Sequence, residues 1–154
     1  MNDSVQRHIA SALAAVEKYL AVKESKDTVP KEYDGYAASF TASVVTSGLL
    51  PTLSFFTDIH KSDKDKEPRR YRITQALMHI LHPIEGEGKH EKNKLLLYAV
   101  GRLYGDGSEN AGRRLDNMDE AKLPVLQREI IDAAIALKLA LRNFKQQATA
   151  GQKD

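Results

Sequence analysis

Apolar residues recur at intervals of three and four along most of the chain, which is the spacing of one face of an α-helix. The strict alternation of apolar and polar residues that is typical of strands is almost absent. The pattern predicts an all-α, compact single-domain bundle of about six helices with a long central C-terminal helix. The expected helices cover about 4–22, 30–48, 49–60, 69–82, 91–104 and 123–147, with a short helical piece near 109–117.

A single glycine separates the second and third helical runs. Gly48 ends the second run at low cost because glycine readily adopts a left-handed backbone, and Leu49, Leu53 and Phe56 restart the apolar stripe at once. The two runs therefore form a tight helical corner, and we expect Phe40 and Phe55 to be buried there. The stripe that leads into the corner consists of Tyr33, Tyr36, Ala37, Phe40 and Val44.

The last helical run carries two apolar stripes on nearly opposite sides. A helix that is apolar on two sides is typical of the centre of a bundle, which is the interpretation favoured here. The alternative is that the second stripe docks a partner subunit. The first stripe is Leu123, Leu126, Ile130, Ala134, Leu137, Leu141 and Phe144, and the second is Ile131, Ile135 and Leu139.

The length of 154 residues suits one domain, expected over residues 1–148, with a disordered tail at 149–154. No apolar run reaches 18 residues, so no membrane span is expected. The N-terminus lacks the basic and apolar regions of a signal peptide, so a cytoplasmic location is expected. The absence of cysteine excludes disulfides, thiol nucleophiles and cysteine-bound zinc.

The formal net charge of +2 conceals an uneven distribution. Residues 61–94 carry 9 Lys and Arg against 6 Asp and Glu, and residues 121–153 carry 6 against 2. Within the first of these ranges, the apolar-free stretch 61–68 is expected to be an exposed linker. A localised basic surface on a nearly neutral protein favours a polyanionic partner, although ordinary solvated lysines explain the counts equally well.

The helical corner resembles the signature of the small all-helical subunit of the type III-B CRISPR (Cmr) RNA-targeting complex. The last helix adds to this resemblance, since Arg128, Asp132 and Arg142 stand where the family has an Arg, an acidic residue and a basic residue. The departures are Leu126 and Leu139 in place of aromatics and Thr41 in place of a Pro. At the corner, the matching residues are Tyr33, Ala37, Val44, Ser47, Gly48, Leu49 and Phe55.

The resemblance implies a non-enzymatic subunit without a cofactor. Proteins of this family stack along the inside of the effector complex and line the channel that holds the guide–target RNA duplex. The implied partners are other subunits of the Cmr complex, further copies of the chain, the guide RNA and the target RNA. Cleavage of the target belongs to other subunits, which agrees with the absence of a recognisable catalytic motif in the sequence.

Two groups of basic residues are the candidate RNA contacts. Lys138, Arg142 and Lys145 are spaced to line one side of the last helix, with Arg128 on the same flank. The second group directly follows the expected linker. Lys and Arg neutralise phosphates without reading sequence, which suits a subunit that must accept any guide. The second group consists of Arg69, Arg70 and Arg72.

Two alternatives remain from other classes of protein. A stand-alone helical DNA-binding regulator would use the corner at Gly48 as a helix-turn-helix, but its second helix has no Arg or Lys before Lys61. A metal-dependent enzyme would need His79, His82 and His90 to converge in a pocket. A structural role at a helix end is the favoured interpretation of these histidines, so no metal site is assigned.

Overall fold

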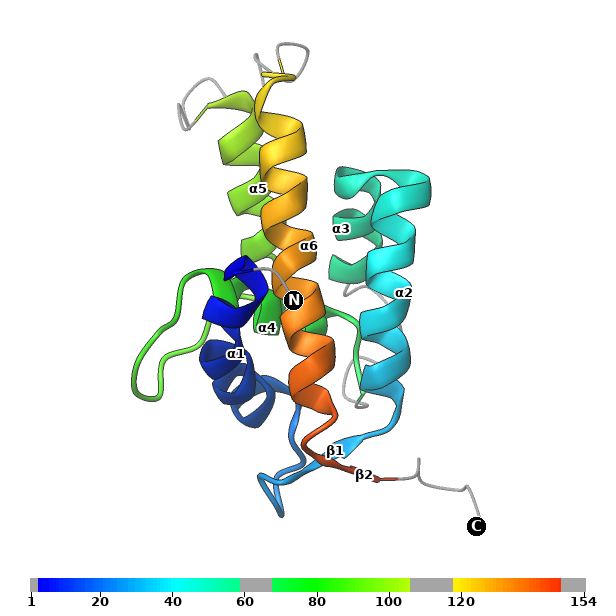
Figure 1. Cartoon of the computed structure of the whole chain (residues 1–154), viewed down its shortest axis with the longest axis vertical. Helices are drawn as coiled ribbons and strands as arrows, with labels where there is room; N and C mark the ends of the chain where they lie inside the picture. Colours follow the sequence, from blue (N-terminus) through cyan, green and yellow to red (C-terminus); the bar gives the residue numbers. More distant parts are fainter. Residues whose placement is uncertain (1–2, 59–67, 106–117, 148–154) are drawn as a thin grey trace.

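The computed structural model describes residues 3–58, 68–105 and 118–147, and within these ranges the chain forms an all-α bundle with one very small sheet (Figure 1). The expected helical piece near 109–117, most of the linker at 61–68 and the expected tail at 149–154 lie outside the described residues. The elements are α1 Asp3–Ala15, the π-helix η1 Val16–Leu20, β1 Thr28–Pro30, α2 Glu32–Ser47, α3 Leu49–Thr57, α4 Tyr71–Leu81, α5 Lys94–Tyr104, α6 Lys122–Leu141 and β2 Lys145–Gln147.

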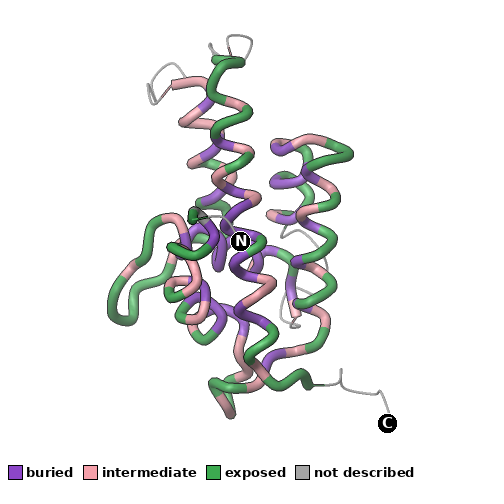
Figure 2. The backbone as a smooth tube through the Cα atoms, in the orientation of Figure 1, coloured by how far each residue is buried: buried purple, intermediate pink, exposed green. Residues whose placement is uncertain are grey.

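The long helix α6 occupies the centre of the bundle and contacts α1, α2, α4 and α5. Figure 2 shows buried positions recurring along the helices of the bundle, α6 among them. On α6 the inward face carries Leu126, Ile130, Leu137 and Leu141, each no more than 2 % exposed. The first apolar stripe of the sequence is therefore the core face of the helix, and the expected central C-terminal helix is confirmed.

The corner between α2 and α3 forms as the sequence indicates. Gly48 has a φ of +97°, a value that side-chain-bearing residues rarely adopt, and its N–H donates to the Val44 carbonyl at 3.0 Å. The buried rings of Phe40 and Phe56 meet edge to face with centroids 5.2 Å apart. The expected burial of Phe55 is wrong, because its side chain is 57 % exposed. The side chain of the next residue, Phe56, is buried instead.

The C-terminal end differs from the expected continuous helix. The helix α6 ends at Leu141, and the expected extension to Gln147 is replaced by a turn and the strand β2. Asn143 caps this end by donating its side-chain amide to the Leu139 carbonyl at 3.3 Å. The strand β2 pairs in parallel with β1, with Thr28, Val29 and Pro30 opposite Lys145, Gln146 and Gln147.

None of the helices in the part of the chain that the structure describes is both long and apolar enough to cross a lipid bilayer. The helix α3 ends at Thr57, whereas the sequence predicts an end at His60. His60 lies outside the described residues.

Candidate nucleic-acid interface

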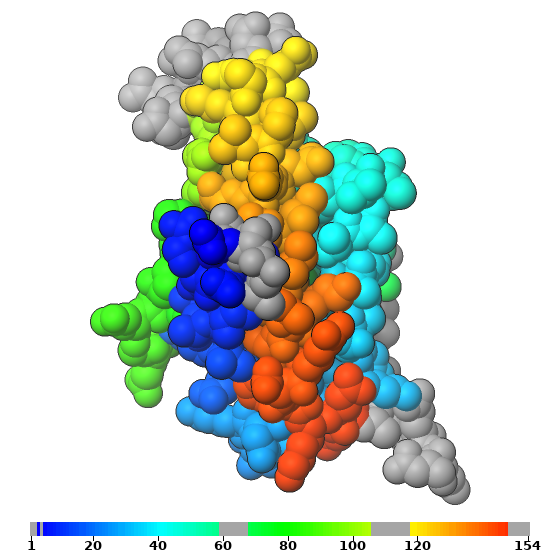
Figure 3. Space-filling model, in the orientation of Figure 1, coloured from blue at the N-terminus to red at the C-terminus, as the bar shows by residue number. Residues whose placement is uncertain are grey.

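The outward face of α6 carries basic and apolar residues in alternation. Arg128, Ile135 and Arg142 are seven residues apart, so they lie on one side of the helix. All three are exposed, Ile135 to 36 %, and Ile131 and Leu139 beside them are half-buried. Figure 3 shows this face of α6 uncovered between α1 and α2. Ile131 and Leu139 pack against the core, so the second apolar stripe is partly buried, and Ile135 is its member at the surface.

The predicted row of Lys138, Arg142 and Lys145 is broken by the end of the helix. Lys138 lies on α6 beside the outward face and is half-buried, and Arg142 follows directly after the last helical residue. Lys145 instead lies in β2, where its Nζ is 4.0 Å from Asp27 Oδ2 on the exposed edge of the small sheet. The placement of Lys145 on the helical flank is wrong, whereas its contact with RNA stays a prediction.

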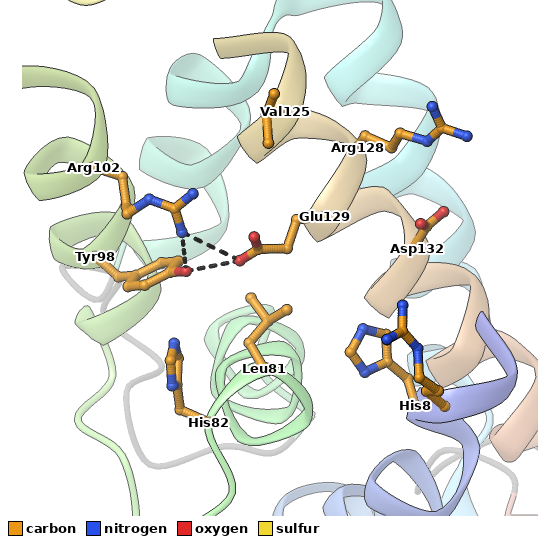
Figure 4. A pocket seen from close by; sticks show the side chains of 10 residues that line it. His8, Leu81, His82, Tyr98, Arg102, Val125, Arg128, Glu129 and Asp132 are labelled. Atoms are coloured by element: carbon orange, nitrogen blue, oxygen red, sulfur yellow. Dashed lines mark hydrogen bonds and ion pairs between the residues drawn. The ribbon is translucent and has the colours of Figure 1, made fainter. Parts of the chain in front are cut away.

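Arg128 also borders a groove of about 700 Å³ between α1, α4, α5 and α6 (Figure 4). Three arginines and two histidines line it against two carboxylates, so its charge is net positive. Grooves of this character attract anions because low-dielectric walls concentrate the field of the cations. The lining residues are Arg7, His8, Leu81, His82, Tyr98, Arg102, Val125, Arg128, Glu129 and Asp132.

A hydrogen-bonded network fixes one wall of this groove. The Tyr98 hydroxyl donates to Glu129 Oε1 at 2.7 Å, and the Arg102 guanidinium lies 3.5 Å from the same oxygen. Burial, followed by the hydrogen bond to Glu129, raises the pKa of Tyr98 above its ordinary value, so its hydroxyl stays a donor. Figure 4 shows Arg128 extending away from this network. Arg102 therefore compensates Glu129, and Arg128 has no ion pair among the described residues.

The second predicted group of arginines packs onto aromatic rings. Arg69, which is 9 % exposed, and Arg72 both lie 5.4 Å from the centre of the buried Tyr71 ring. Arg70 is exposed and lies 5.0 Å from the Tyr36 ring centre and 5.1 Å from that of Phe55. The three arginines are therefore not one free cationic cluster, because Arg69 is buried, Arg72 is half-buried and only Arg70 is exposed.

The three histidines of the metal-enzyme alternative lie near one another but are engaged in the fold. His79 is 5 % exposed, and its Nδ1 accepts the backbone N–H of Ile84 at 3.4 Å. The Nε2 of His90 hydrogen-bonds to the His82 carbonyl at 2.7 Å. Within the described ranges, no group of three or more His, Asp or Glu side chains is arranged to hold a metal ion.

The DNA-regulator alternative requires α3 to enter a groove of DNA. The helix α3 contains no Arg or Lys, and Leu49, Leu53 and Phe56 are buried against the rest of the bundle. A recognition helix needs side chains that hydrogen-bond to base edges, and the sequence of α3 supplies few of them.

Sequence reasoning missed Arg7 and Arg102, which line the groove beside Arg128. These residues come from α1 and α5, and no regular spacing in the sequence connects them with Arg128 on α6. Their only local signal is that each is a basic residue beside a core stripe, which many solvated arginines share.

Comparison with known proteins gives one match. The family model described as CRISPR-associated protein (Cas_Cmr5) matches residues 5–139, which is most of the chain. No curated protein and no solved structure matches the chain.

Proposed function

Because the chain belongs to the CRISPR-associated Cas_Cmr5 family and is thus a small subunit of a type III-B CRISPR (Cmr) complex, we propose that it acts without catalysis. In this proposal the subunit stacks along the inside of the complex and contacts the backbone of the guide–target RNA duplex. Its other partners are the neighbouring Cmr subunits and further copies of the chain. We also propose that residues 1–148 form a single domain.

The observation that carries the RNA contact is the outward face of α6. Arg128 and Arg142 are both exposed, and their separation of 14 positions corresponds to roughly 21 Å along the helix. A straight row of cations of this length can meet more than one phosphate of a strand. The rigid helix holds the charges in place, and Lys138 adds a third charge beside them.

The chemistry of these residues suits a guide of any sequence. Lys and Arg contacts to phosphates supply affinity and position the strand but carry no base information. The groove beside Arg128 adds Arg7 at the same end of the face. Arg70, together with Lys145 on the edge of β2, is a further candidate contact outside this face.

A non-catalytic role agrees with the state of the carboxylates in the groove. Tyr98 and Arg102 both engage Oε1 of Glu129, so this carboxylate anchors one wall of the groove. Asp132 is 7 % exposed and lines the same groove, where its charge offsets part of that of the arginines.

The test is charge reversal on the outward face of α6 in the assembled complex. The triple variant Arg128→Glu, Lys138→Glu and Arg142→Glu should retain less guide–target RNA at low salt. Each lost phosphate contact should lower the slope of log affinity against log salt by about one unit. The loss should be the same for guides of different sequence.

A matched triple variant, Lys26→Glu, Lys31→Glu and Lys94→Glu, makes the same charge change at exposed lysines outside α6. It should leave RNA retention nearly unchanged. Equal losses in both variants would mean that only net charge matters. Normal retention by the α6 variant at all salt concentrations would refute the RNA contact on this face.

A further inference from the structure

A second pocket, of about 490 Å³, lies where η1, β1 and the first turn of α2 meet. Its size falls within the range of small-molecule sites. It shares no lining residue with the groove beside Arg128. Its walls include Leu20, Pro30 and the two buried tyrosines Tyr19 and Tyr33.

Among the described residues that line this pocket, cations outnumber carboxylates. Lys18, Lys23, Lys89 and Arg72 line it, against Glu24 and Glu32. Lys18 donates its Nζ to the backbone carbonyls of residues 84 and 86, at 2.9 and 3.1 Å. Carbonyls orient an ammonium group but do not cancel its charge. None of the three lysines forms an ion pair with a residue that the structure describes.

The carboxylate of Glu32 has an unsatisfied oxygen atom. The Glu32 Oε1 atom is buried and accepts no hydrogen bond. No ion pair joins Glu32 to any of the described residues. Leaving a buried acceptor unpaired costs on the order of 1–3 kcal/mol. Rotation of the carboxylate about its last side-chain bond costs little, so a donor that enters the pocket can relieve this loss.

The backbone that presents Lys18 and Tyr19 to the pocket is the five-residue π-helix η1. π-Helices are rare and occur frequently at functional sites. The widened turn is fixed by the Tyr19 hydroxyl, which accepts the His90 N–H at 2.9 Å. The loop between α4 and α5 is thus tied to η1 and carries Lys89 to the rim of the pocket.

We propose that this pocket binds a nucleotide. The lysines and Arg72 hold the phosphate, and Glu32 accepts hydrogen bonds from the edge of the base. A ligand that carries both an anionic group and hydrogen-bond donors satisfies both the cations and the carboxylate that line the pocket. The nucleotide is either free in solution or an unpaired nucleotide of an RNA strand.

The test is titration of the ¹⁵N-labelled protein, observed by NMR, with GMP as the probe. Guanine presents two adjacent donors to a carboxylate, so GMP engages Glu32 fully. Shifts of backbone amide signals should concentrate at residues 18–24, 31–33, 72 and 89. Lys89→Glu and Glu32→Gln should each weaken binding about tenfold or more, as loss of a charged hydrogen bond does.

Lys94→Glu is the matched control, since it makes the same charge change at an exposed lysine outside the pocket. It should leave the affinity for GMP unchanged, as should the triple variant of α6. Equal weakening by Lys89→Glu and Lys94→Glu would overturn the proposal. So would an affinity for inorganic phosphate or guanosine equal to that for GMP, or the absence of shifts at the pocket.

A five-nucleotide single-stranded RNA separates the two sources of the ligand. Shifts at the same residues with both GMP and the RNA would assign the pocket to a nucleotide of a strand. Shifts with GMP alone would assign it to a free nucleotide. Shifts with the RNA that are confined to α6, with none from GMP, would overturn the nucleotide site while supporting the proposed RNA contact.

Discussion

Phe40 and Phe55 lie close together at the corner between α2 and α3 but differ in their contribution to stability. Phe40 is fully buried and packs edge to face on Phe56, whereas Phe55 is 57 % exposed. Phe40→Ala should lower the free energy of unfolding by about 3–5 kcal/mol, because it leaves a cavity in the core. Urea denaturation followed by circular dichroism measures the loss.

Phe55→Ala is the matched comparison, because it removes the same side chain from the surface of the same corner. Its ring is 57 % exposed, meets the Phe56 ring edge to face and lies near the guanidinium of Arg70, so the expected loss is about 1 kcal/mol or less. Similar losses for the two variants would contradict this assignment.

His79 makes the stability of the fold depend on pH. Burial lowers the pKa of His79 below its ordinary value, and the nearby charges of Lys18 and His90 lower it further. The unfolded chain therefore binds a proton more readily than the folded chain, so stability is lost as pH falls below about 6.5. Protonation also removes the lone pair with which Nδ1 accepts the Ile84 N–H.

His79→Gln should flatten the dependence of the thermal midpoint on pH between about 7 and 5. His82→Gln is the control, because its side chain is exposed. A pH dependence that is unchanged in His79→Gln and reduced in His82→Gln would contradict the role of His79.

At the scale of elements, the apolar spacing was sufficient to predict the helices and the corner at Gly48, because each depends on residues close in sequence. It could not decide between Phe55 and Phe56, since adjacent apolar residues differ only in which faces the neighbouring helix. The strands β1 and β2 were missed for another reason. Each is three residues long and gains its hydrogen bonds only from a partner more than 100 residues away.

Some residues of the candidate site could be predicted from local sequence, and others could not. Arg128 and Arg142 were found because helical spacing places them on one side of α6. Arg7 and Arg102 become neighbours of Arg128 only after α1, α5 and α6 have packed. The pocket around Glu32 likewise forms only when distant segments pack together, so no local sequence pattern predicts it.

The outward face of α6 leads to a prediction about assembly. Ile135 is exposed in the isolated subunit, so Ile135→Glu should leave helical circular dichroism and thermal unfolding nearly unchanged. It should nevertheless reduce co-purification with the other Cmr subunits if this apolar residue is covered in the complex. Ile130→Glu should instead unfold the chain, because Ile130 is fully buried on the opposite face. Global unfolding of Ile135→Glu would restore the interpretation that both stripes are core.

At the scale of the whole molecule, the small sheet joins two segments that are far apart in the sequence. The strand β1 precedes α2 and β2 follows α6, so their pairing ties the C-terminal end of the central helix to the first third of the chain. Two backbone bonds flank the ladder, from Lys145 N–H to the Asp27 carbonyl at 2.8 Å and from Lys31 N–H to the Gln147 carbonyl at 3.0 Å. Figure 1 shows this junction at the base of the bundle.

Proline substitution can test whether this junction stabilises the fold. Lys145→Pro removes the N–H that bonds to Asp27 and should lower the free energy of unfolding by about 1 kcal/mol. Gln146→Pro is the matched control, because groups in a strand alternate in direction and the N–H of Gln146 therefore points away from β1. A parallel comparison by urea denaturation should show a loss only for Lys145→Pro. Equal effects of the two prolines would mean that the hydrogen bond from the Lys145 N–H to the Asp27 carbonyl adds nothing to stability.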